Sequence, residues 1–217
     1  MRLFRNRSEA GRVLATHLGE YENRTDVIVL ALPKGGVPVA AEVASALAAP
    51  LDVLVVRKIG APQSPEFAVG AIASGGMMVL DTRTMHELGL TRASLDSVIQ
   101  AEQQEVIRRD RLYRRGRPFP GLEDQVVILV DDGLATGATM HAAVMALRSR
   151  APAVVVVAVP VASRSALVML NQVVDRVVCV AAPEPFYGVG AWYENFDQTT
   201  DEEVLSLLAG REVPLLA

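Results

Sequence analysis

Two adjacent carboxylates, Asp131 and Asp132, stand directly after five apolar residues, Val126–Val130. Four of those five residues are β-branched, which is typical of a strand buried on both faces inside a parallel sheet. The acids are followed by a run of small and hydroxylated residues, 133–139. In open α/β sheets, ligands bind beyond the carboxyl ends of the strands. The sequence therefore predicts a binding site at this point of the chain.

The run after the two acids has the composition of an anion site. Gly133 and Gly137 allow positive φ and a close approach of the backbone to a ligand. The N–H groups from Ala135 to Thr139 open a predicted helix, whose dipole favours a phosphate, and Thr136 adds a hydroxyl donor. The acids would repel that phosphate, so we expect them to face the vicinal hydroxyls of a ribose or a magnesium ion. A sugar 5′-phosphate satisfies both halves of the site.

The order apolar strand, Asp-Asp, three residues and Thr-Gly-x-Thr closely resembles the phosphoribosyl pyrophosphate (PRPP) motif of the type I phosphoribosyltransferases. The loop lacks the Gly-Lys-Ser/Thr ending of a P-loop, which disfavours a nucleoside triphosphatase. The resemblance implies that Asp131 and Asp132 hold the ribose hydroxyls, and that Mg²⁺ binds through PRPP and meets the acids through water. It assigns the 5′-phosphate to the backbone and hydroxyls of Ala135, Thr136, Gly137, Ala138 and Thr139.

A second candidate anion site follows the apolar segment 27–32, which we predict as a strand. There Lys34, Gly35 and Gly36 precede an alanine-rich helix that runs to about residue 47. Taken alone, the segment is a simple strand-to-helix turn. Beside a PRPP motif it is similar to the pyrophosphate loop of the same family, with Lys34 and the amides of both glycines on the leaving group.

A third group of charges, Arg57 and Lys58, ends the predicted strand 52–56. The next segment, 59–66, contains glycine, serine and two prolines, and we predict an irregular, mobile loop. The resemblance implies that this loop closes over pyrophosphate and keeps water from the cation-like ribosyl transition state. Adjacent strand residues point to opposite faces, so only one of the two cations should reach pyrophosphate. The loop is marked by Gly60 and Glu66.

Half of the aromatic residues fall in the segment 183–196. One interpretation is a wall for a planar base, built by Phe186, Tyr187 and Trp192. The other is a cluster that pins the C-terminal part to the core, and the sequence favours neither. Ala135 stands where enzymes for 6-oxopurines carry an Asp, which argues against hypoxanthine, guanine or xanthine. No residue identifies the acceptor.

Arginines concentrate in two places. One group, which includes Arg7, makes residues 2–12 basic, as a solvated face or as the border of a phosphate site. The other lies at 108–117, where pairs such as Glu105–Arg109 and Asp110–Arg114 favour a solvated helix face over an RNA site. The RNA interpretation supports a rival hypothesis, a regulator that senses PRPP without catalysis.

The elements expected to position these residues alternate between strand and helix, which predicts an α/β fold with three layers and a mainly parallel sheet. We expect one domain over 1–217, with a core at about 24–182, a hairpin and long helix inserted at about 67–117, and a hood formed by the N-terminal helix and 183–217. The further expected elements are a helix 8–20 capped by Ser8, hairpin strands 67–73 and 77–80, a helix 91–115, a helix 140–150, a strand 153–159, a helix capped by Ser163, a strand 176–182 and a helix capped by Thr200.

The composition sets the wider limits. The chain has 217 residues, 51% hydrophobic and 21% charged, enough for a sizeable core, and its single cysteine excludes a disulfide framework. Neither a signal core nor an apolar run of bilayer length is evident. A net charge of −4 argues against a general nucleic-acid binder. We predict a cytoplasmic enzyme of nucleotide metabolism that uses PRPP, Mg²⁺ and a small-molecule acceptor, and the resemblance is compatible with a homodimer.

Overall fold

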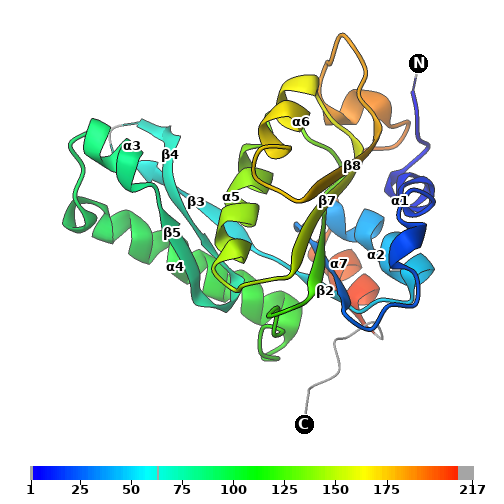
Figure 1. Cartoon of the computed structure of the whole chain (residues 1–217), viewed down its shortest axis with the longest axis horizontal. Helices are drawn as coiled ribbons and strands as arrows, with labels where there is room; N and C mark the ends of the chain where they lie inside the picture. Colours follow the sequence, from blue (N-terminus) through cyan, green and yellow to red (C-terminus); the bar gives the residue numbers. More distant parts are fainter. Residues whose placement is uncertain (1, 63, 210–217) are drawn as a thin grey trace.

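Five parallel strands form the central sheet, in the order β2-β1-β6-β7-β8. The computed structural model, which describes residues 2–62 and 64–209, is shown in Figure 1. The strands are β1 (Val27–Ala31), β2 (Leu51–Val53), β6 (Val126–Val130), β7 (Val154–Val161) and β8 (Arg176–Ala181). Every residue of β1 and β6 is buried. The mainly parallel sheet predicted from the apolar runs is confirmed.

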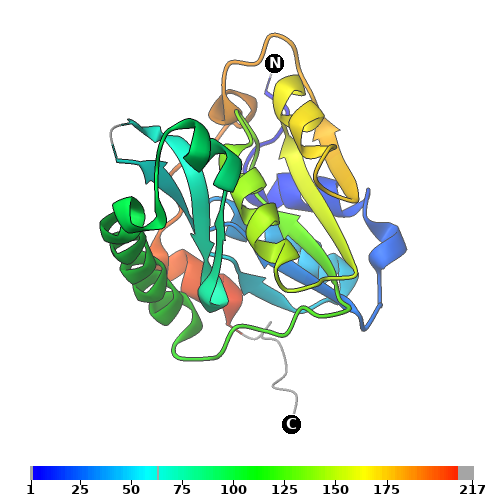
Figure 2. The same ribbon diagram turned by 60° about the vertical axis from the view of Figure 1, so that its left-hand side comes forward.

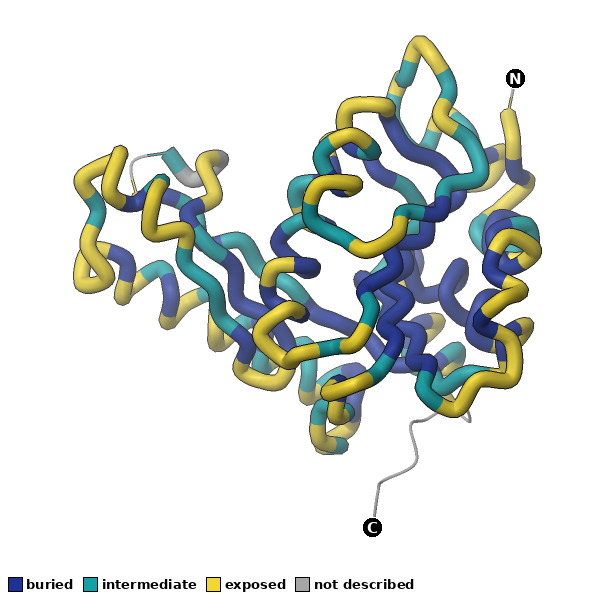
Figure 3. The backbone as a smooth tube through the Cα atoms, in the orientation of Figure 1, coloured by how far each residue is buried: buried dark blue, intermediate teal, exposed yellow. Residues whose placement is uncertain are grey.

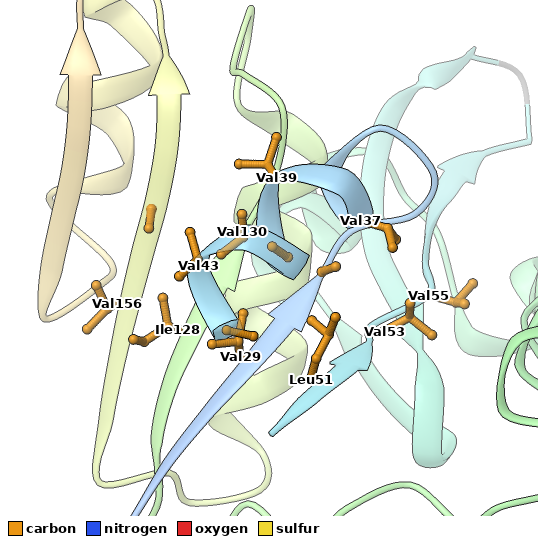
Figure 4. Close-up of a cluster of buried hydrophobic side chains, with 14 of the residues drawn as sticks. Val29, Val37, Val39, Val43, Leu51, Val53, Val55, Ile128, Val130 and Val156 are labelled. Carbon is orange, nitrogen blue, oxygen red and sulfur yellow. The ribbon is translucent and has the colours of Figure 1, made fainter. Parts of the chain in front are cut away.

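Helices cover both faces of this sheet, because its apolar side chains alternate between two cores. One core contains Val29 and Ile128 with α1 (Arg7–Ala15), α2 (Gly36–Leu47) and α7 (Asp201–Leu208), and part of it is shown in Figure 4. The other contains Leu30 and Leu129 with α5 (Ala138–Arg148) and α6 (Arg164–Leu170). The burial colours of Figure 3 follow these layers, with the darkest tube along the central strands. The three-layer α/β fold is therefore as expected.

A second sheet lies to one side of the core. It is antiparallel, with the order β3-β4-β5, and its strands are β3 (Val56–Ala61), β4 (Ser64–Ala73) and β5 (Met77–Leu80). Helices α3 (Thr82–Glu87) and α4 (Arg92–Arg114) continue this lobe, which Figures 1 and 2 show beside the parallel sheet. The predicted hairpin and long helix are confirmed, and the lobe begins earlier than expected.

Several local predictions were wrong. The segment 59–66 is not an irregular loop, because most of it pairs as β3 and β4 with a bulge at Gly60. The expected strand 52–56 is divided between the two sheets. Helix α1 is capped by Asn6, whose side chain accepts from the Glu9 amide at 2.9 Å, so Ser8 lies inside the helix. That helix ends at Ala15 instead of residue 20.

Other helix starts were predicted correctly. Thr91, Ser163 and Thr200 cap α4, α6 and α7 through their side-chain oxygens. The aromatic segment 183–196 contains only a short 3-10 helix, Val189–Trp192. Within residues 2–62 and 64–209, none of the helices combines the length and the apolar character that crossing a bilayer requires.

Candidate active site

Two of the predicted loops meet at the carboxyl ends of the neighbouring strands β1 and β6. A Cβ atom on Gly35 would overlap the carboxylate of Asp132. A Cβ atom on Gly36 would stand 2.7 Å from the carbonyl oxygen of Val130 and 2.9 Å from Cα of Asp131. The two glycines therefore allow the turn after β1 to pack directly on the acids. The structure brings these two groups of candidate residues together, as the parallel sheet predicts.

The loop 135–139 presents an open set of backbone donors. Gly137 has φ of 73° and forms the N-cap position of α5. Within the described part of the chain, the amides of Ala135, Thr136, Gly137 and Thr139 donate to no protein acceptor. The amide of Ala138 reaches only Thr136 Oγ1, at 3.4 Å. These amides therefore have the geometry of an anion site at a helix N-terminus.

Strand β7 supports this loop from the side. The amide of Leu134 donates to the carbonyl of Val161 at 2.9 Å, and Ser163 N donates to the Leu134 carbonyl at 2.9 Å. The Ser163 hydroxyl donates to the carbonyl of Ala135 at 2.5 Å while it caps α6. The sequence predicted Ser163 only as a helix cap. Its second bond orients the first peptide of the candidate phosphate loop.

The two acids share a poorly solvated site. Asp131 Oδ1 accepts the amide of Asp132 at 2.8 Å. Burial raises the pKa of Asp131 well above its usual value, and the neighbouring charge of Asp132 raises it further. Burial also raises the pKa of Asp132, against the opposing effect of Arg7, whose Nε lies 2.8 Å from Asp132 Oδ2. One cation, Arg7 of α1, thus offsets part of the negative charge of the two acids.

Arg7 is held by residues of the aromatic segment and its neighbours. Its guanidinium lies 3.9 Å from the ring centre of Phe196 and donates to the carbonyl of Asp197 at 2.6 Å. The Tyr193 hydroxyl donates to the carbonyl of Asp132 at 2.6 Å. The basic N-terminus was the only sequence signal for Arg7, and nothing in the sequence distinguished it from the other arginines of that segment.

Lys34 is tied to α7. Its Nζ lies 3.1 Å from Asp201 Oδ1, which also accepts the Tyr113 hydroxyl at 2.7 Å. The prediction that both glycine amides face pyrophosphate was wrong for Gly36, because its amide donates to the carbonyl of Leu32 at 3.1 Å to close the turn. The amide of Gly35 has no acceptor among the described residues.

Arg57 and Lys58 are not assembled with these groups. Both lie within β3 instead of at a strand end, and Arg57 Nε is 2.6 Å from Glu102 of α4. Arg57 was predicted as a candidate contact for pyrophosphate, and in this structure its guanidinium binds the Glu102 carboxylate. The side chain of Glu66 lies outside the described part of the chain.

The aromatic segment packs mainly as a cluster. The rings of Phe186 and Trp192 are 6.4 Å apart, and both pack against the buried group that includes Phe4 and Tyr193. The side chain of Tyr187 is exposed, at 77%. The structure therefore favours packing for Phe186 and Trp192 and leaves Tyr187 at the surface. A Cβ on Gly133 would stand 2.6 Å from a methyl of Val189, so this segment also touches the loop after the acids.

The arginine-rich helix uses much of its charge internally. Arg108 and Arg109 both bind Glu105, at 2.7 and 2.6 Å. Arg114 is buried and binds Asp52 and Asp110. Both predicted pairs are confirmed, but Arg114 is buried and so does not lie on the solvated helix face that the sequence predicted.

The carboxylates of Asp131 and Asp132 suit a metal ion that arrives bound to a ligand. Among residues 2–62 and 64–209, there is no cluster of three or more histidine, cysteine or acidic residues that could hold a metal. Mg²⁺ retains water and binds commonly through one or two carboxylates and substrate phosphates. Asp131 and Asp132 fit that mode.

Comparison with known proteins identifies the family of the chain. The model of the phosphoribosyl transferase domain matches residues 5–191. The chain is 45% identical, over 96% of its length, to two proteins named "Putative phosphoribosyl transferase" from Mycobacterium tuberculosis, MT0597 of strain CDC 1551 and Rv0571c of strain H37Rv. It spans only 47% of those relatives.

A solved structure resembles the whole chain. TT1426 from Thermus thermophilus is 41% identical, covers 98% of this chain and 100% of its own, and superposes with a TM-score of 0.89. AQ2163 from Aquifex aeolicus shares the fold at a TM-score of 0.51, with 11% identity over 96% of this chain and 87% of its own. The chain therefore belongs to the phosphoribosyl transferase family, as the resemblance of its acid-pair motif to the type I enzymes predicted.

Proposed function

We propose that this protein transfers the 5-phosphoribosyl group of PRPP to a nitrogenous acceptor, with release of pyrophosphate. The acceptor nitrogen forms a bond to C1′ of the ribose, and the bond from C1′ to pyrophosphate breaks with inversion at that carbon. A nucleobase is the proposed acceptor class. The reaction requires a 5′-phosphate site, a grip on the ribose and a charged site for the departing group.

One observation carries the proposal: the loop 135–139, four of whose amides donate to no described protein acceptor, follows the acids Asp131 and Asp132, and these acids pack against the glycines of the turn Gly35–Gly36. A phosphate on the amides would receive hydrogen bonds and the favourable end of the α5 dipole. The ribose hydroxyls of the same ligand would then meet the acids. The pyrophosphate would meet Lys34 and the free amide of Gly35.

Charge stabilisation and positioning supply the catalysis in this scheme. Lys34 stabilises negative charge that grows on pyrophosphate, and Mg²⁺ bound with PRPP would neutralise part of the same charge. Arg57 and Lys58 lie in the separate β3-β4-β5 sheet. We propose that one of the two reaches pyrophosphate when that sheet moves toward the loops, a movement that would also exclude water.

In this scheme the acceptor binds beside the aromatic segment 183–196, which packs on Gly133. Val189 contacts that glycine, and Tyr187 is the exposed aromatic residue among the three predicted to bind a base. Ala135 offers no side-chain acceptor or donor to a base. We therefore propose stacking as the main contribution of this chain to base binding, with adenine, orotate-like acceptors and other amines ahead of the 6-oxopurines.

A screen of acceptors tests the proposal. Pyrophosphate release is measured with PRPP, Mg²⁺ and a panel of bases and amines, for the wild-type protein, Asp132→Asn and the control Asp96→Asn, whose aspartate is exposed on α4. We expect release with one acceptor class, loss in Asp132→Asn and no change in the control. If no acceptor gives pyrophosphate release, the proposed enzymatic activity is refuted. Tight PRPP binding in the same samples would then favour the hypothesis of a PRPP sensor.

A further inference from the structure

Arg7 differs from the other arginines of the N-terminal segment in how completely it is enclosed. Its side chain is 12% exposed, whereas those of Arg5 and Arg12 are 70% and 54% exposed. Three groups fix it: the Asp132 carboxylate, the Asp197 carbonyl and the ring of Phe196. A surface arginine kept for solubility needs none of these partners. Arg7 is therefore built into the site.

The contact leaves half of the Asp132 carboxylate available. Arg7 Nε binds Oδ2 at 2.8 Å, while Oδ1 accepts no hydrogen bond from the described residues. The backbone of the same residue is held by the Tyr193 hydroxyl, and Gly35 provides the space that Oδ2 occupies. One oxygen is thus anchored and the other is free for a ligand. This is the arrangement expected of a carboxylate that must present one acceptor in a fixed direction.

We propose that Arg7 is a positioning residue, which holds Asp132 in the orientation that binds a ribose hydroxyl. Phe196 and Asp197 hold Arg7 in turn. Through the Arg7 guanidinium, these two residues therefore influence the position of the Asp132 carboxylate. This inference rests on the proposed function for the identity of the ligand. The contact between Arg7 and Asp132 is independent of it.

Electrostatics around Asp132 explain why a cation is needed. The titratable and charged groups nearby are Asp131 in the same loop, Arg7 from α1 and Tyr193 from the hood, while Lys34 of the adjacent turn is paired with Asp201. Two adjacent carboxylates with little solvent resist being charged together. Arg7 offsets that repulsion at Asp132.

The variants Arg7→Gln and Arg7→Lys test this role, with Arg12→Gln as the matched control. Arg12 lies on the same helix and pairs with Glu42 at the surface. Affinities for PRPP with Mg²⁺ are measured by calorimetry at neutral pH. We expect Arg7→Gln to weaken binding by about ten-fold or more. Arg7→Lys should retain more affinity than Arg7→Gln, and Arg12→Gln should match wild type.

Two further readouts separate the possible outcomes. In ligand-free protein at one fixed pH, the ¹³C carboxyl signal of Asp132 should shift in Arg7→Gln relative to wild type, whether or not PRPP binds. Binding of inorganic pyrophosphate alone should be unchanged, because Arg7 acts on the acid. An equal loss of pyrophosphate binding would make Arg7 a direct phosphate ligand and overturn the proposal.

An unchanged Asp132 carboxyl signal together with unchanged PRPP affinity in folded Arg7→Gln would also overturn it. If the Asp132 signal shifts but wild type does not bind PRPP, the proposed function fails and the positioning role stands. Thermal unfolding identifies a variant that does not fold. If Arg7→Gln does not fold, Arg7→Lys is compared with wild type instead.

Discussion

Lys34 and Asp201 form an ion pair of 3.1 Å that joins the turn after β1 to the first residue of α7. The same carboxylate accepts the hydroxyl of Tyr113, which lies in α4. One aspartate therefore connects the candidate pyrophosphate turn with the closing helix and with the lobe that carries the second sheet. Lys34 is shared between this aspartate and any anion that enters the turn.

Replacing Asp201 with Asn should tighten the binding of inorganic pyrophosphate, because Lys34 would lose a competing partner. Exposed ion pairs contribute about 0.2–1 kcal/mol, so an increase in affinity of about 1.4- to five-fold is expected. Glu202→Gln, one residue along in α7 and exposed, is the control. Calorimetry with pyrophosphate measures both. Weaker binding in Asp201→Asn would show that the pair holds Lys34 in a productive position.

Gly35→Ala should damage the site without unfolding the core. Its Cβ would overlap the Asp132 carboxylate that Arg7 also binds, so the turn and the acid could not both keep their places. PRPP affinity should fall by about ten-fold or more. Gly19→Ala is the control, since a Cβ there meets nothing within 4 Å. Equal affinities for the two variants, measured by calorimetry, would mean that the contact between the loops has no part in binding.

The core of the fold could be predicted because its signals are local. The strands β1, β6 and β7 are continuous apolar runs, and the residues that define the acid-pair loop follow one another in the sequence. The contact between Arg7 and Asp132 could not be predicted in this way. It joins residues 125 positions apart, and the arginine type alone does not tell a buried partner from a solvated one.

The segment 59–66 was predicted wrongly for a different reason, because a local signal was misleading. Gly60, Pro62 and Pro65 lower the local preference for a strand, so the sequence favoured a loop. In the structure β3 pairs with β4, and register shifts around Gly60 accommodate the irregularity. Pairing with a neighbouring strand overrode the local preference. Arg57 was consequently expected at a strand end, whereas it lies inside β3 and faces Glu102.

Asp131→Asn should stabilise the protein at neutral pH. Burial and the Asp132 charge raise the pKa of Asp131 above its usual value of 3.8, so the folded state binds more protons than the unfolded state above that pH. The ionised acid therefore reduces the free energy of unfolding as pH rises from about 3.8. The gain from asparagine should be largest near neutral pH and should vanish toward pH 3. Urea unfolding across pH measures it, and a gain independent of pH would contradict this cause.

Arg114→Met should be strongly destabilising. Both Arg114 and Asp52 are buried, and the guanidinium Nε lies 3.1 Å from each Asp52 carboxylate oxygen. Removing one partner of a buried pair costs about 3–5 kcal/mol, because the other charge stays uncompensated. Arg111→Met, at an exposed position of the same helix, should cost less than about 1 kcal/mol by the usual range for surface substitutions. Urea midpoints for the two variants that lie close together would contradict a structural role for this pair.

The central claim is that the amides of 135–139 bind the 5′-phosphate of a sugar held by the neighbouring acids. Amide-resolved NMR during a titration with ribose 5-phosphate tests it most directly. We predict that the N–H signals of Ala135, Thr136, Gly137, Ala138 and Thr139 move together and saturate with one affinity, while that of Asp96, exposed on α4, stays in place. Saturation that leaves these five amides unmoved, or no saturable change at all, would contradict the claim.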